Sequence, residues 1–158
     1  MHTLIEEIYG NRVRVRACGL YCEDNKLLLV NHENLTLTDF WAPPGGGVEF
    51  GESAEAALIR EFKEETGLDV TIGKLLFVCE FISPPLHAIE LFFEVSHAQG
   101  VLSAGKDPEM GRRQQIIKEA IFIAFEDLDA IPKERKHGVF ALAPCAANIN
   151  QLRGYLRI

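Results

Sequence analysis

Apolar residues alternate with polar ones, or run together, in five segments that have the length of β-strands. These segments are 12–23, 26–31, 70–82, 89–95 and 116–125. The turn-forming pair Asp24–Asn25 separates the first two segments, which predicts a hairpin. Residues 98–113 are polar and have no period, so they predict an irregular connection.

One segment has the period of a helix. Residues 53–66 combine good helix formers with an apolar stripe, which comprises Ala54, Leu58, Ile59 and Phe62. Ser53 is the expected N-cap, and Gly67 is the expected residue after the last turn. A second helix is expected within 138–153. The proline and glycine content of 43–47 predicts a loop.

The length of 158 residues suits a single domain over residues 1–158. Hydrophobic residues make up 47% of the chain and charged residues 25%, which is the balance of a globular protein and not of a disordered one. The order of elements is hairpin, loop, helix, strands, loop, strand and helix. This order predicts an α/β or α+β fold with a mixed sheet.

The formal net charge is −7. This acidic balance argues against a protein that binds duplex nucleic acid, which would present a basic field. It permits a small nucleotide ligand, because a bound cation can reverse the local sign of the charge. No apolar run reaches the roughly 18 residues of a membrane span, and the first residues carry acid where a signal peptide carries base. We therefore expect a cytoplasmic protein with no membrane partner.

Three glutamates lie along one edge of the expected helix. Glu61, Glu64 and Glu65 stand at positions i, i+3 and i+4, where like charges repel by about 0.2–0.5 kcal/mol per pair. A divalent cation would remove this repulsion, because Mg²⁺ and Mn²⁺ prefer carboxylate oxygen. The alternative is a solvated acidic helix face that holds no ligand.

The residues around the acidic edge favour the metal site over the solvated face. Gly45–Gly47 allow a tight backbone turn, whose carbonyls and amides can face a metal ion or a phosphate. Glu52 stands just before the N-cap, where the helix dipole alone also favours an acid. Arg60 precedes the acid cluster and can hold a carboxylate through its fork of N–H groups.

This arrangement resembles the signature of the Nudix (MutT-like) hydrolases. The matching positions are Gly46, Glu52 and the run Arg60–Leu68, at the spacing of that family. Phe62 departs from the family's usual aliphatic residue, although it is also large and apolar. The resemblance extends to the upstream hairpin and to Glu119–Leu128, and so covers most of the chain. It implies a Nudix-type α/β/α sandwich around a mixed β-sheet.

The resemblance also implies an activity. Members mostly hydrolyse a pyrophosphate bond in a nucleoside diphosphate linked to another group, with Mg²⁺ or Mn²⁺ as cofactor. The implied metal ligands are oxygens of Glu61, Glu65, Glu64 and, as a backbone carbonyl, Gly45 or Gly46. Arg60 would hold the glutamates in place rather than contact the substrate.

Further residues are candidates for the general base and for substrate contacts. Glu119 is placed like the distal acid that assists in several family members, and the alternatives are a box glutamate as the base and a strand-edge role for Glu119. Arg14 and Arg16 alternate along the first strand, which predicts either phosphate contacts or a solvated face. Trp41 stacks on a base or packs in the core. Glu52 joins the substrate site or only favours the start of the helix.

The sequence leaves the substrate open among a nucleoside triphosphate, a nucleotide sugar and an ADP-ribose-like compound. Ser83-Pro84-Pro85 stands about where ADP-ribose-type members often carry a proline, since 84 − 68 gives 16 residues after Leu68. A nucleotide-binding regulator or sensor on the same fold is the alternative to an enzyme. A sensor should have lost the box glutamates, which this chain keeps. Homodimers are common in the family.

Overall fold

The computed structural model describes residues 4–32, 39–103 and 117–158. Its helices are α1 (Leu4–Tyr9), α2 (Ala54–Thr66) and α3 (Phe125–Ala130), followed by the 3₁₀ helices η2 (Lys133–Arg135), η3 (Gly138–Ala141) and η4 (Ala146–Gln151). Its strands are β1 (Arg12–Leu20), β2 (Cys22–Glu23), β3 (Lys26–His32), β4 (Phe40–Ala42), β5 (Gly45–Gly47), β6 (Asp69–Ser83), β7 (Leu86–Gln99), β8 (Ile117–Ala124) and β9 (Gly154–Arg157).

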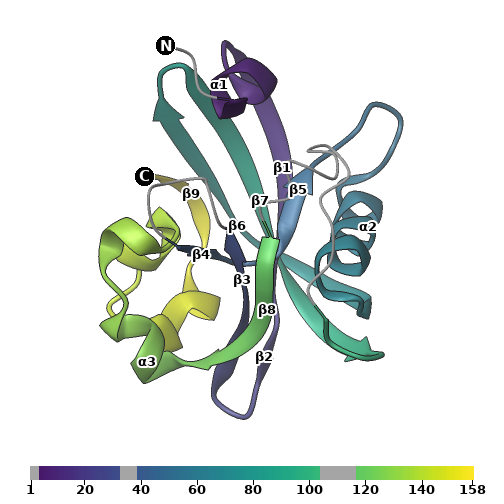
Figure 1. The fold of residues 1–158 in the computed structure, drawn as a ribbon, viewed down its shortest axis with the longest axis vertical. Coiled ribbons are helices and arrows are strands. Elements are labelled where there is room, and N and C mark those ends of the chain that lie inside the picture. Colours follow the sequence, from purple (N-terminus) through teal and green to yellow (C-terminus); the bar gives the residue numbers. More distant parts are fainter. Residues whose placement is uncertain (1–3, 33–38, 104–116) are drawn as a thin grey trace.

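The strands form two sheets. The larger sheet has the order β5-β1-β7-β6-β9 and is mixed, because β1 pairs with β7 and β6 with β9 in parallel, while the other pairs are antiparallel. The smaller sheet has the order β2-β3-β4, with β8 also paired to β3. Both sheets lie between α2 on one side and the C-terminal helices on the other (Figure 1).

Two buried clusters hold these layers together. One lies between α2 and the sheets, where Leu58 and Phe62 are fully buried. The other lies under the C-terminal segment, where Leu128, Val139 and Ile149 are fully buried. Burial of side chains of this size stabilises a fold by about 1.5–3 kcal/mol each. The two clusters confirm the α/β/α sandwich around a mixed β-sheet.

The hairpin and the helix expected from the sequence are confirmed. Asp24 and Asn25 both have positive φ, at 51° and 61°, in the turn between β2 and β3. The loop expected over 43–47 is wrong in part, because Gly45–Gly47 form β5 on β1. A Cβ at Gly45 would lie 2.3 Å from the carbonyl oxygen of Ala17, so only glycine allows this pairing.

The helix expected within 138–153 is wrong. The structure has the two short 3₁₀ helices η3 and η4 there, which are separated at Pro144. A proline disfavours the helical conformation of the residue before it, so one continuous helix is not expected across this position. The connection expected over 98–113 lies mostly outside the described residues, and β7 extends into its start. Within the described ranges, no helix has the length and apolar composition to cross a membrane.

Candidate active site

Helix α2 begins and ends at the residues that its sequence indicates. The Oγ atom of Ser53 accepts a hydrogen bond from the Ala56 N–H at 3.1 Å, which caps the first turn. Gly67 has a φ of 76°, and its N–H donates to the carbonyl of Lys63. A left-handed residue favours glycine, and it closes the helix immediately after the last acid. The position of the glutamates along the helix is therefore fixed at both ends.

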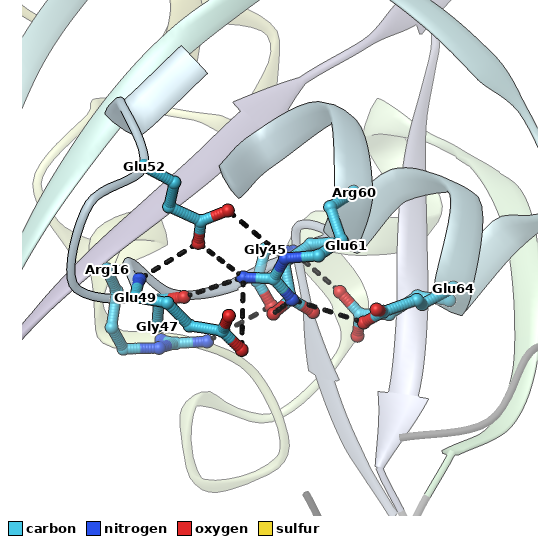
Figure 2. Close-up of polar contacts among 9 residues, drawn as sticks. Arg16, Gly45, Gly47, Glu49, Glu52, Arg60, Glu61 and Glu64 are labelled. Atoms are coloured by element: carbon cyan, nitrogen blue, oxygen red, sulfur yellow. Dashed lines mark hydrogen bonds and ion pairs between the residues drawn. The ribbon is translucent and has the colours of Figure 1, made fainter. Parts of the chain in front are cut away.

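Arg60 lies at the centre of the acidic residues (Figure 2). Its guanidinium lies 2.7 Å from Glu52, 2.9 Å from Glu61 and 3.4 Å from Glu64. It also donates to the Gly47 carbonyl at 3.1 Å, which ties the helix to β5. The hydrogen bonds from Arg60 lower the pKa of Glu52. This geometry agrees with the role expected for Arg60, which is to hold carboxylates in place.

Two of the three glutamates are buried. Glu61 is 8% exposed and Glu65 is 3% exposed, although both are charged residues on a helix. Glu65 accepts a hydrogen bond from the Gly45 N–H at 2.8 Å. A Cβ at Gly46 would lie 2.3 Å from the carboxylate of Glu61, so the backbone of β5 passes directly against this acid. Carboxylates are rarely buried to this extent unless they have specific partners.

The donor chemistry of this region fits a divalent cation. In the described part of the chain, no three acidic, histidine or cysteine side chains converge closely enough to hold a metal ion as they stand. The carboxylate of Glu61 turns to Arg60, and that of Glu65 turns to Gly45. Carboxylate and carbonyl oxygens are the ligands that Mg²⁺ and Mn²⁺ prefer. The residues present fit such an ion once these two side chains turn toward it.

A cavity of about 490 Å³ lies beside the buried glutamates. Its lining brings together acidic, basic and aromatic side chains from elements that are far apart in the sequence. They include Glu61, Glu65 and Glu90, then Arg14, Arg16, Lys133 and Lys136, then Tyr9, Phe40 and Phe81. A cavity of this volume and composition suits a small molecule that carries both negative charge and a flat ring.

The two arginines expected to bind substrate both line this cavity. Arg14 lies 3.9 Å from the centre of the Tyr9 ring, in a cation–π contact. Arg16 pairs with Glu90, and its Nε atom is buried with no hydrogen-bond partner in the described ranges. The Nδ1 atom of His32, which also lines the cavity, is likewise buried with no hydrogen-bond partner in the described ranges. Burial, together with the charge of Arg16, lowers the pKa of His32 to about 4.

The structure adds a buried carboxylate that the sequence reading missed. Glu90 is 2% exposed and lies between Arg16, at 2.5 Å, and the Nε2 atom of His137, at 2.8 Å. Burial alone would raise the pKa of Glu90, but its interactions with His137 and Arg16 lower it to about 2. One signal was present: Glu90 interrupts the apolar run 89–93.

Five residues expected at the site do not line the cavity. Trp41 is 8% exposed and packs in the core, although its carbonyl accepts a hydrogen bond from the His137 N–H. Arg60 is one of them, and it forms ion pairs with two others, Glu52 and Glu64. Glu119 lies on β8 and accepts a hydrogen bond from the Asn31 side chain at 3.4 Å.

Comparisons with known proteins find relatives that are named pyrophosphatases and diphosphatases. The chain is 39% identical over 119 residues to an ADP-ribose pyrophosphatase of Methanocaldococcus jannaschii, a match that covers 73% of this chain and 62% of the relative. It is 34% identical over 92 residues to an 8-oxo-dGTP diphosphatase of Proteus vulgaris, which covers 57% of this chain and 82% of that protein. The chain thus spans less than two thirds of the archaeal relative's length.

Solved structures share the fold. A MutT NUDIX hydrolase from Burkholderia pseudomallei superimposes with a TM-score of 0.66 at 22% identity, over 80% of this chain and 92% of that one. At this identity the likeness concerns the fold alone. The family model of the NUDIX domain matches residues 10–142, which include the capped acidic helix, the glycine strand and most of the cavity lining. The chain therefore belongs to the NUDIX domain family.

Proposed function

We propose that this protein hydrolyses a pyrophosphate bond in a nucleoside diphosphate linked to another group, with Mg²⁺ or Mn²⁺ as cofactor. The observation that carries this proposal is the cavity that is lined both by Glu61 and Glu65 and by the arginines of β1. The acids suit a cation, and the arginines suit the phosphate oxygens of the same ligand. The names of the relatives, which act on ADP-ribose and on 8-oxo-dGTP, support the same class of bond.

The acidic residues would hold the metal. Glu61 and Glu65 are the principal ligands in this proposal, with Glu64 and the carbonyl of Gly46 beside them. When bound, the cation neutralises phosphate oxygens and lowers the pKa of a water ligand. Arg60 holds the glutamates in position through the contacts that it already makes.

The remaining residues bind substrate or move a proton. Arg14 and Arg16 contact phosphate oxygens from β1. In this proposal Glu119 is the distal acid, and it would reach the site from β8. Glu52 acts through Arg60, and Trp41 supports the cavity wall from the core. A single domain, a homodimer and a cytoplasmic location stay predictions.

A substrate panel tests this proposal. The purified protein is incubated with ADP-ribose, a nucleotide sugar and nucleoside triphosphates, in Mg²⁺, Mn²⁺ or EDTA, and the products are identified by mass spectrometry. Metal-dependent release of a nucleoside monophosphate from at least one compound is the expected result. Nucleotide binding without hydrolysis in either metal would instead indicate a sensor.

A further inference from the structure

Glu90 is an acid placed where strands normally carry apolar residues. It lies on β7 directly across from Arg16 of β1 in the parallel register, and both side chains line the cavity. Its two carboxylate oxygens are divided among three partners. Oε2 accepts from Arg16 and, at 3.5 Å, from the Cys18 thiol, and Oε1 lies 2.8 Å from Nε2 of His137. A carboxylate this deeply buried persists only where its partners satisfy it.

The backbone of η3 fixes which proton His137 carries. The Nδ1 atom of His137 accepts a hydrogen bond from the Val139 N–H at 3.0 Å, so Nδ1 has no proton. The proton of the neutral ring is therefore on Nε2, which donates to Glu90. The His137 N–H also donates to the Trp41 carbonyl, which holds the residue to β4. Glu90 thus has Arg16 and the Cys18 thiol as donors at one oxygen and His137 at the other, and only an acceptor on both sides satisfies them.

These contacts link the C-terminal segment to the acidic helix. The Nη2 atom of Arg16 lies 3.5 Å from the Gly45 carbonyl oxygen, while its Nη1 atom contacts Glu90. The Gly45 N–H in turn donates to Glu65. A series of polar contacts therefore runs from His137 through Glu90 and Arg16 to the strand that lies against the expected metal ligands.

We propose that Glu90 is a positioning residue, which holds Arg16 toward the cavity for a substrate phosphate and anchors His137 at the cavity wall. This proposal rests on the proposed function, because it concerns the same site. Glu90 itself contacts neither the metal nor the substrate. It acts through Arg16, so its loss should weaken substrate binding more than it slows the chemical step.

Substitution of Glu90 by Gln separates positioning from simple charge balance. Gln preserves the size of the side chain but presents an N–H group to the donors on one of the two sides. His137 cannot accept that group without releasing Val139, so Arg16 or His137 must move. The substitution also leaves Arg16 unneutralised, which by charge alone would tighten the binding of an anion. Positioning predicts weaker binding, whereas charge balance predicts tighter binding.

The experiment compares KM, kcat and metal-free binding of ADP by calorimetry in EDTA. Glu90→Gln should raise KM and the Kd for ADP by about tenfold, which is the scale of one lost hydrogen bond to a charged group, with kcat changed less than threefold. Glu94→Gln, the same substitution further along β7 and outside the cavity lining, is the matched control and should leave both unchanged. In an Arg16→Gln background, Glu90→Gln should add little.

A second variant tests the same proposal if Glu90→Gln does not fold. Glu90→Asp keeps an acceptor on both sides with a shorter reach, so its KM should lie between those of the wild type and the Gln variant. Unchanged or tighter binding in either variant would overturn the positioning role, as would additive effects with Arg16→Gln. A wild type without hydrolysis would contradict the proposed function alone, because ADP binding would still report on Glu90. A wild type that does not bind ADP would overturn both.

Discussion

At the scale of single residues, burial separates the glutamates of α2. Glu61 and Glu65 are buried between the helix and β5, whereas Glu55 is exposed on the first turn. The spacing of the acids was readable in the sequence. Their burial was not, because it depends on how closely β5 approaches. Gly46 makes that approach possible, since any side chain there would overlap the carboxylate of Glu61.

His32 gives a prediction for the pH dependence of stability. Its pKa is lowered to about 4 in the fold, from an ordinary value of 6.5, first by burial and then by the charge of Arg16. The unfolded chain therefore binds a proton at this residue at a higher pH than the folded chain does. The free energy of unfolding should keep its full value above about pH 6.5 and should fall as the pH drops toward 4.

The measurement is the free energy of unfolding in urea at pH 7 and at pH 4.5. We expect His32→Gln to lose less stability over this interval than the wild type, because Gln does not titrate. Equal losses in both proteins would show that His32 does not contribute to the pH dependence.

At the scale of elements, the contact between α2 and β1 explains the unusual Phe62. This residue is fully buried, and it packs against the backbone at Gly19. A Cβ at Gly19 would lie 2.5 Å from the Phe62 ring and 2.8 Å from Val95. The large aromatic ring on the helix is thus matched by the absence of a side chain on the strand.

This match predicts the effect of adding a methyl group at position 19. Gly19→Ala should destabilise the fold by about 1–3 kcal/mol, because overpacking forces the ring or the strand to shift. Phe62→Leu in the same chain should recover part of that loss, since Leu leaves room for the new methyl. The test is chemical denaturation of the wild type and the three variants. If the two substitutions are simply additive, the packing explanation is wrong.

The elements differ in how far the sequence determines them. Helix α2 was predictable, because Ser53 and Gly67 are local signals for its ends. The buried stripe of this helix was predictable only in part. Ile59, which was expected in the core, is 43% exposed, whereas Glu61 and Glu65 are buried. The strand at Gly45–Gly47 was not predictable, because three glycines have no strand preference and pair only through contact with β1.

At the scale of the whole molecule, the candidate site is assembled from distant parts of the chain. The acidic helix and the arginines of β1 could be identified from local patterns. Glu90 and His137 are separated by 47 residues and meet only in the fold. No local period marks such a pair, so the wall of the cavity formed by the C-terminal segment emerged only from the structure.

Metal binding should stabilise the whole fold. An ion that binds the native state but not the unfolded chain adds about 2.7 kcal/mol at 100 times its Kd. For a chain of this size, that corresponds to a rise in Tm of about 5–10 °C. Thermal unfolding with saturating Mg²⁺ or Mn²⁺ and with EDTA measures it. The rise should be absent from a Glu61→Gln, Glu65→Gln double variant, and a rise of equal size there would place the ion elsewhere.

The turnover of Glu65→Gln at saturating Mg²⁺ tests the central claim most directly. This substitution keeps the size of the side chain and removes one oxygen ligand from the expected metal site. The rate should fall by about 10²–10³, the usual cost of losing one preorganised electrostatic group. Glu55→Gln, on the exposed first turn of the same helix, should remain close to the wild type. A folded Glu65→Gln protein that retains more than about a third of wild-type turnover, far above the fall expected for a lost electrostatic group, would contradict the assignment of this helix face to catalysis.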